Sequence, residues 1–154
     1  MCGRYYVDMD TEKEIRIVIR DPEQKISLEA GYVHPSEQAL VLTGINARLT
    51  TERMRWGFPQ NGKKGLLINA RAETVFQRVT FRDCVRNRRC IIPAGHFYEW
   101  NKKKEKAVFR REDSPILYMA GIWSSFEDGF AEYLLKKTPV LLKREQEYEQ
   151  MMFF

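Results

Sequence analysis

Short runs in which apolar and polar residues alternate occur along most of the chain, and they predict a protein built largely from short strands. The first run is the aromatic-rich CGRYYV at the amino terminus. Further strands are predicted at 39–44, 51–59, 66–75, 90–100, 107–113 and 114–123. Within 90–100, Pro93 and Gly95 are expected to form a turn between two strands. The last two runs, AVFRRED and SPILYMAGIW, are expected to pair with each other.

Helical spacing is confined to a few segments. In TEKEIRIVIR (11–20), Ile15, Val18 and Ile19 fall on one helical face, and Thr11 is the predicted N-cap. A short arginine-bearing helix is predicted within 76–90, and another helix within 143–152. Many strands with a few flanking helices predict a single α+β domain over residues 1–154, built around a curled, mostly antiparallel sheet with a barrel-like core.

Composition narrows the class of protein. The 154 residues are 44% hydrophobic and 31% charged, which is typical of a soluble globular domain. The chain has no apolar run of the roughly 20 residues that span a membrane, and it does not open with a signal-peptide pattern. A cytoplasmic protein with no membrane partner is therefore expected.

Cysteine and histidine usage argues against a disulfide framework or a structural zinc site. The three cysteines are Cys2, Cys84 and Cys90, no CxxC pair occurs, and there are only two histidines. No metal and no cofactor are predicted. The formal net charge of +5 permits a polyanionic partner without requiring one.

Cys2 is a candidate nucleophile. Removal of Met1 would leave an α-amine and a thiol on one residue, with ordinary pKa values of about 8 and about 8.5. Such an aminothiol condenses with an aldehyde to an imine, which the thiol closes into a thiazolidine ring. Strand alternation places Cys2, Arg4 and Tyr6 on one face, so Arg4 could hold a phosphate nearby. The alternative is a small buried residue at the start of a strand.

The stretch INARAE brings three polar groups together if it is extended. Asn69, Arg71 and Glu73 would share one face, with alanines on the other. Asn69 could orient a reacting group, and Arg71 could clamp a phosphate with two hydrogen bonds. The alternative is an Arg71–Glu73 pair on an exposed strand.

Glu99 lies between Tyr98 and Trp100 in PAGHFYEW. Aromatic neighbours would desolvate its carboxylate and raise its pKa, which suits a general acid–base. The alternative is that Glu99 faces solvent on an alternating strand.

Five motifs together resemble the SOS-response-associated peptidase (SRAP) family. They are MCGRY at the amino terminus, MRWGF (54–58), INARAET (68–74), RRCIIPAGHFYEW (88–100) and MAGIW (119–123), in family order. The resemblance implies a SRAP-like domain that captures abasic sites in single-stranded DNA as a thiazolidine crosslink, as part of the DNA damage response.

The resemblance also implies roles for individual residues. Cys2 would be the nucleophile, Asn69 would position its amine or the sugar, and Glu99 would transfer protons. Arg4 and Arg71 would bind phosphates beside the lesion. A monomer is expected, associated with the nucleoid when bound to DNA. Two alternatives remain: a cysteine-dependent peptidase that removes Met1, and a non-covalent reader of modified DNA.

The chain departs from the family near its carboxyl end, which is shorter than usual. Leu135 stands where the family has a histidine, Lys137 replaces an arginine, and Pro139 keeps a proline. Either this is a divergent, shortened member without that histidine, or the segments FAE and YLL are not truly adjacent. The two histidines, His34 and His96, are expected to be structural or surface residues.

A second departure follows the tryptophan–glycine pair of the MRWGF motif. Many family members carry an aromatic wedge there, whereas this chain has the polar loop PQNGKKG (59–65). The lysines of that loop could contact phosphates, but stacking on unpaired bases needs a ring or a guanidinium group. A preference for strand junctions is therefore not predicted.

Overall fold

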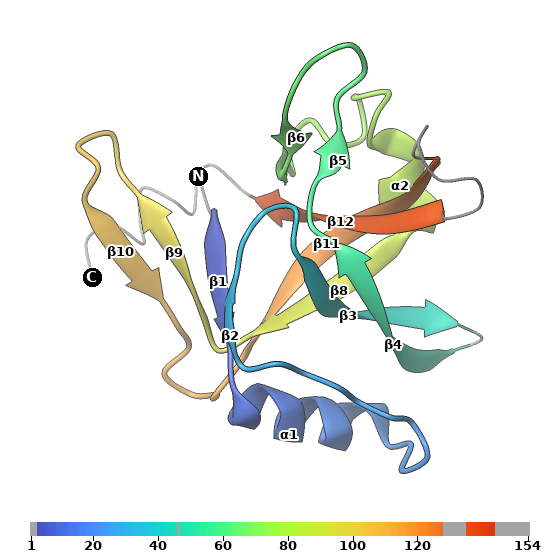
Figure 1. Ribbon diagram of the computed structural model, residues 1–154, viewed down its shortest axis with the longest axis vertical. Coiled ribbons are helices and arrows are strands. Elements are labelled where there is room, and N and C mark those ends of the chain that lie inside the picture. Colours follow the sequence, from blue (N-terminus) through green and yellow to red (C-terminus); the bar gives the residue numbers. More distant parts are fainter. Residues whose placement is uncertain (1–2, 46, 128–134, 144–154) are drawn as a thin grey trace.

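The computed structural model describes residues 3–45, 47–127 and 135–143. These residues form two helices and three sheets (Figure 1). In chain order the elements are β1 (Arg4–Val7), α1 (Met9–Ile19), β2 (Gly31–Val33), β3 (Gln38–Ile45), β4 (Arg48–Arg55), β5 (Phe58–Pro59), β6 (Leu66–Leu67), β7 (Asn69–Arg71), α2 (Arg82–Asn87), β8 (Arg89–Ala94), β9 (His96–Trp100), β10 (Lys106–Phe109), β11 (Leu117–Glu127) and β12 (Leu135–Lys143). The predicted α+β class is confirmed, as is the curled, mostly antiparallel sheet.

The strands divide between two main sheets. A four-stranded sheet has the order β10-β9-β1-β2, and a six-stranded sheet has the order β4-β3-β8-β11-β12-β7. Among the strands of the described residues, only β12 and β7 pair in parallel, while β5 and β6 form a small separate ladder. The main hydrophobic core lies where the two sheets meet, because it takes Tyr5 and Val33 from the first sheet and Val41 and Ile92 from the second.

Gly95 joins the two sheets. It is the single residue between β8 and β9, which diverge from it as the two arms of a V (Figure 1). Its N–H donates to the carbonyl of Tyr6 at 2.8 Å, and a Cβ at this position would lie only 3.0 Å from Oδ2 of Asp8. The prediction of a turn at Pro93 was wrong, because Pro93 lies inside β8 opposite Tyr118.

Pairing of the later strands also differs from expectation. β10 pairs with β9, whereas β11 pairs with β8 and β12. The two runs 107–113 and 114–123 were predicted to pair with each other, and they belong to different sheets instead. Local alternation identifies a strand but carries no information about its partner.

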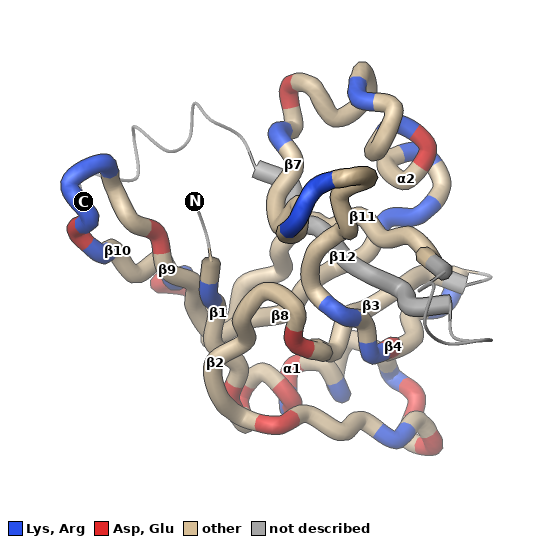
Figure 2. The backbone as a smooth tube through the Cα atoms, turned by 45° about the horizontal axis from the view of Figure 1, so that its top comes forward, with Lys and Arg blue, Asp and Glu red and all other residues tan. Residues whose placement is uncertain are grey.

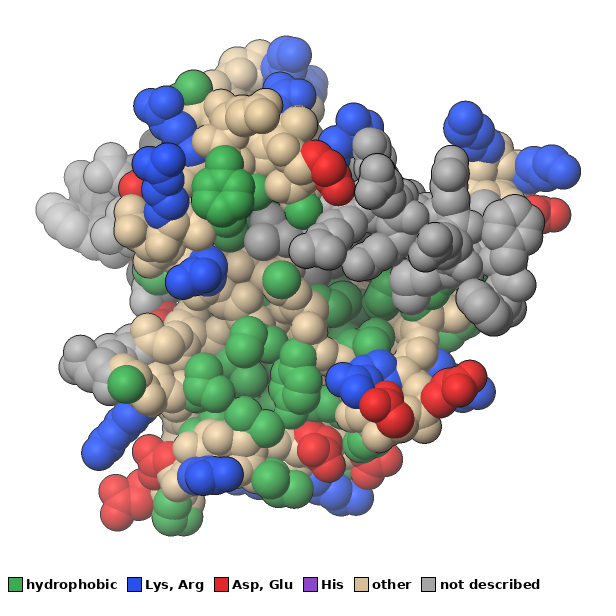
Figure 3. Space-filling model, turned by 180° about the vertical axis from the view of Figure 1, so that it is seen from behind, with side chains coloured by type: hydrophobic (Ala, Val, Ile, Leu, Met, Phe, Trp, Pro, Cys, Tyr) green, Lys and Arg blue, Asp and Glu red, His purple; other side chains and the backbone are tan. Residues whose placement is uncertain are grey.

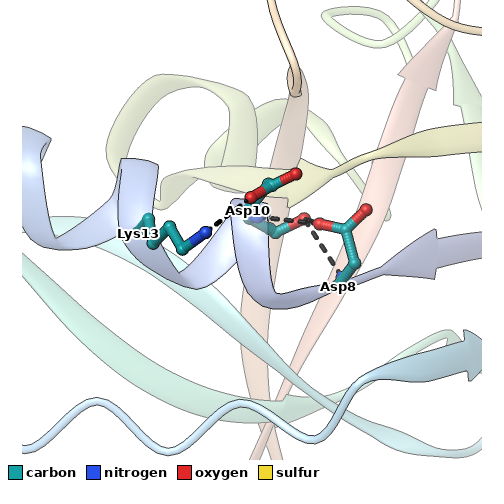
Figure 4. Close-up of polar contacts among 4 residues, drawn as sticks. Asp8, Asp10 and Lys13 are labelled. Carbon is teal, nitrogen blue, oxygen red and sulfur yellow. Dashed lines mark hydrogen bonds and ion pairs between the residues drawn. The ribbon is translucent and has the colours of Figure 1, made fainter.

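Helix α1 begins with a capping box (Figure 4). The Thr11 N–H donates to Oδ1 of Asp8 at 2.8 Å, and the Asp8 N–H donates to Oγ1 of Thr11 at 3.2 Å. One turn further along the chain, Lys13 pairs with Asp10. The N-cap is therefore Asp8, and Thr11 is the third helical residue instead of the predicted cap.

The buried face of α1 is narrower than its pattern predicts. Ile15 and Ile19 are buried as expected, but Val18 is 36% exposed, next to the more open Ile17 at 64%.

Seen from behind, apolar side chains gather on the lower part of the surface (Figure 3). In the part of the chain that the structure describes, no helix combines the length and apolar character needed to cross a bilayer.

Gly121 lies in the centre of β11, opposite Cys90 of β8 and Leu141 of β12. A Cβ there would lie 2.8 Å from Sγ of Cys90 and 2.9 Å from Cδ1 of Ile92. We expect Gly121→Ala to lower the free energy of unfolding by about 1–3 kcal/mol through overpacking. Urea unfolding followed by circular dichroism measures this change.

Gly44 of β3 provides the matched control, because a Cβ there would meet no atom within 4 Å. Gly44→Ala is expected to leave the free energy of unfolding within about 0.5 kcal/mol of the wild-type value. Equal stability of the two variants would contradict the close approach of β11 to β8.

Candidate functional site

β1 carries the amino-terminal motif. Its residues alternate between partly exposed (Arg4, Tyr6) and buried (Tyr5, Val7), which confirms the predicted strand. Cys2 lies outside the described residues, so its assignment as the nucleophile stays a prediction. The first strand residue, Arg4, follows it by two positions.

Arg4 lies against two aromatic rings. Its guanidinium carbon is 5.5 Å from the ring centroid of Tyr32 and 5.7 Å from that of Trp100. Contacts of this kind favour a cation over the face of a ring and hold the long side chain in one place. Arg4 is thus kept at the amino-terminal end of β1, and its role as a phosphate ligand stays a prediction.

Glu99 is buried in the strand next to β1. Its side chain is 1% exposed, and the register of β1 on β9 sets Arg4 opposite Tyr98. The alternative in which Glu99 faces solvent is wrong. Burying a carboxylate costs free energy unless hydrogen bonds or ion pairs replace its hydration. Buried ionisable groups in a protein are often found at functional sites. Glu99 thus lies buried on the strand next to β1, and its role in proton transfer stays a prediction.

β7 carries Asn69 and Arg71 on the edge of the six-stranded sheet, parallel to β12. Asn69 is half-buried, Ala70 is buried and Arg71 is exposed, so the predicted alternation holds over these three residues. The strand ends there, because the Thr74 N–H donates to the Arg71 carbonyl in a turn. The prediction that Glu73 shares the strand face was wrong, since it lies in this turn.

Trp56 lies between β1 and the start of β7, the strands that carry Arg4, Asn69 and Arg71. Its indole is 1% exposed and lies 5.3 Å, centroid to centroid, from the ring of Tyr5 on β1. Its Nε1–H donates to the carbonyl of Ile68 at 2.9 Å. Ile68 precedes Asn69, and Tyr5 follows Arg4, so one buried side chain fixes the position of β1 relative to β7. Sequence reasoning missed this role, although Trp56 belongs to the MRWGF motif.

Lysine and arginine positions of the backbone lie on two sides of β1 (Figure 2). The lysines of the β9–β10 turn lie on one side, and the arginines around α2 together with the loop before β6 lie on the other. β1 runs between them. This distribution suits a polyanion that passes over the end of β1.

The two described cysteines are both buried. Burial raises the pKa of Cys90 to about 12, so it remains a thiol at neutral pH. Cys84 lies 3.5 Å from a guanidinium nitrogen of Arg88 and is 3% exposed. Neither is placed to meet a large substrate. Among the described residues, no cluster of histidine, cysteine and acidic side chains could hold a metal ion.

Leu135, Lys137 and Pro139 lie on β12. Leu135 is its first residue, opposite Glu127, and Pro139 is opposite Trp123. The preceding segment 128–134 and the helix predicted at 143–152 lie outside the described residues, apart from Lys143, which ends β12. The two explanations of the missing histidine therefore both stay open.

Comparison with known proteins gives a consistent family. The model of the SOS response associated peptidase (SRAP) family matches residues 1–150. The abasic site processing protein YoaM of Bacillus subtilis is 28% identical over 97% of this chain and 78% of its own length. The abasic site processing protein YedK of Escherichia coli is 30% identical over 84% of this chain and 63% of its own length.

Two solved structures share the fold. A phage-related protein from Bordetella bronchiseptica has a TM-score of 0.69 at 19% identity, over 94% of this chain and 70% of its own. A protein from Bacteroides thetaiotaomicron has a TM-score of 0.71 at 19% identity, over 93% of this chain and 68% of its own. The chain thus spans between about six and eight tenths of the length of these four proteins.

Proposed function

The chain belongs to the SOS response associated peptidase family, and from this premise we propose that it captures abasic sites in single-stranded DNA. Two relatives are named abasic site processing proteins. A role in processing abasic sites in DNA follows from that kinship. The covalent route, the preference for single strands and action as a monomer are the further parts of the proposal.

The proposed chemistry uses Cys2 after removal of Met1. The ring-opened abasic sugar carries an aldehyde at C1′, which the α-amine of Cys2 attacks to give a carbinolamine. Loss of water from this adduct gives an imine. The thiol sulfur then adds to the imine carbon while a proton moves to the nitrogen, which closes the thiazolidine ring. One water is released, and no oxidation or reduction takes place.

Glu99 is proposed to move the protons. As an acid it would protonate the departing hydroxyl of the carbinolamine, and as a base it would accept the proton of the thiol. Asn69 would orient the amine or the sugar, while Arg4 and Arg71 would bind the flanking phosphates. The observation that carries this proposal is the buried carboxylate of Glu99 on the strand adjacent to β1.

The test is a denaturing gel of the purified protein after incubation with an oligonucleotide that contains one abasic site. Intact mass first establishes whether Met1 has been removed, since a capped amine cannot condense. A shifted band is expected with the abasic strand. None is expected with an undamaged strand, or with a strand whose aldehyde has been reduced to the alcohol.

The outcomes separate the alternatives. Binding of the abasic strand without a covalent band, in protein that lacks Met1, would favour a non-covalent reader of modified DNA. Cleavage of a peptide in trans that depends on Cys2 would favour a peptidase. A peptidase that acts only on its own Met1 would prepare the crosslinking residue, and turnover would then be limited.

A further inference from the structure

The outward side of the four-stranded sheet carries an unusual set of rings. Strand alternation and register place Tyr6, Tyr32, His96, Tyr98 and Trp100 on one side, which we call the aromatic face. The opposite side of the same strands is buried in the protein interior and includes Tyr5, Val7, Val33, Glu99 and Phe109. The sheet thus has aromatic side chains on both sides, although only one side faces the main core.

The rings of the aromatic face touch one another in a continuous series. Tyr6 stacks on His96 with centroids 4.9 Å apart and planes at 18°, and it meets Tyr32 edge-on at 5.1 Å. Tyr32 lies 5.9 Å from Tyr98, which lies 6.3 Å from Trp100. Hydroxyl contacts of Tyr98 with Tyr32 at 3.3 Å and with His96 at 3.0 Å fix the central rings. A preorganised platform of this kind loses little entropy when it binds a flat ligand.

Two cations accompany the rings. Arg4 lies over Tyr32 and Trp100, and Nζ of Lys106 lies 4.9 Å from the ring centroid of Tyr98. On strands β1, β2, β9 and β10 the positions of this side carry no acidic residue, because Glu99 belongs to the buried side. Asp8, just beyond β1, is engaged in the cap of α1. The charge of the face therefore complements a polyanion.

The rings of the aromatic face differ in their exposure to solvent, and the most exposed of them is open to a stacking base. Tyr32 is 49% exposed, and Tyr6, His96 and Trp100 are partly exposed. Tyr98 is only 8% exposed and lies beneath its neighbours. Single-stranded nucleic acids bind to surfaces that combine exposed rings for their bases with cations for their phosphates, and each stacked base contributes substantially to affinity.

We propose that the aromatic face binds unpaired nucleotides that flank the reactive residue, with one base stacked on Tyr32 and phosphates near Arg4 and Lys106. The inference rests on the proposed function for its connection to Cys2, which lies two residues before Arg4 in the chain. The rings of the aromatic face come from another part of the fold and would take the place of the aromatic wedge that the loop 59–65 lacks.

Fluorescence anisotropy with an undamaged, dye-labelled oligothymidine tests the face separately from the crosslink. Tyr32→Ala is expected to weaken binding by about tenfold, whereas Tyr32→Phe keeps the ring and should bind like the wild type. Tyr118→Ala removes a tyrosine of similar exposure, 40%, on β11 and should change nothing. Lys106→Gln is expected to reduce the slope of log affinity against log salt by about 1.

Crosslinking to an abasic strand is measured in the same variants over a range of DNA concentrations. Tyr118→Ala should crosslink like the wild type, whereas Tyr32→Ala should need about tenfold more DNA to reach the same yield. If the wild type binds undamaged strands through Tyr32 but never crosslinks, the proposed function fails and the aromatic face stands. Equal affinities of Tyr32→Ala, Tyr118→Ala and the wild type would overturn the aromatic face alone. An equal loss of affinity for duplex DNA would also overturn it, because paired bases cannot stack on Tyr32.

Discussion

Cys2→Ser is expected to remove the covalent band with abasic DNA entirely under denaturing conditions. The α-amine of the serine variant still forms an imine with the aldehyde, but a hydroxyl with a pKa far above that of a thiol closes the ring poorly. The imine then hydrolyses when the protein unfolds. Added borohydride should restore a band in this variant, since it reduces the imine to a stable amine, and this distinguishes the loss of ring closure from the loss of binding.

Cys84→Ala is the matched control for this experiment. Cys84 is 3% exposed and Cys90, with its raised pKa, is 5% exposed, so neither thiol can reach a sugar in the folded protein. The control variant should crosslink at the rate of the wild type. A full band in Cys2→Ser without borohydride, or a lost band in Cys84→Ala, would move the reactive thiol away from the amino terminus.

Glu99→Gln is expected to slow crosslinking by about 10²–10⁴-fold, the usual contribution of a general acid–base. Glutamine has nearly the same shape as glutamate and fits the same buried position, but it can neither donate nor accept a proton during imine formation. The rate is measured in a single turnover, with protein in excess over an abasic oligonucleotide, by sampling the covalent band over time.

Glu105→Gln removes the same charge nearby and serves as the comparison. Glu105 is exposed in the β9–β10 turn, where its carboxylate accepts a hydrogen bond from Asn101. Its variant should react like the wild type. The midpoint temperature of unfolding and the affinity for undamaged DNA should change little in Glu99→Gln. If both drop together with the crosslinking rate, Glu99 supports the fold and does not transfer protons.

The local pattern of apolar and polar residues predicted the features that depend on a single strand or a single helix. The alternation in CGRYYV correctly gave β1, and the apolar spacing of Ile15 and Ile19 correctly gave the buried side of α1. It overestimated that side at Val18, because a surface helix on a small domain needs only a narrow apolar stripe. It also extended β7 too far, since Glu73 has a strand-like position in the sequence but lies in the turn after Arg71.

Features that join distant segments could not be predicted. The partners of β10 and β11 depend on register between residues far apart in sequence, which alternation does not encode. The bend at Gly95 is another case, because its close approach to Asp8 arises only when both sheets are present. The burial of Glu99 was one of two open interpretations, and the packing of β9 against the interior decides between them.

The contact of Trp56 with Tyr5 and Ile68 has a consequence for the newly made chain. A nascent polypeptide presents its amino terminus to the cell as soon as it leaves the ribosome, long before residues 56–100 have been added. In the proposed mechanism, its aminothiol would then react without help from Glu99 or Asn69. Because the contacts that bring these segments together join residues far apart in sequence, which slows their formation, the proposed assistance would begin only after the segments have packed together. Maturation of the chain would thus act as a safeguard against premature reaction with the free aldehydes of metabolism.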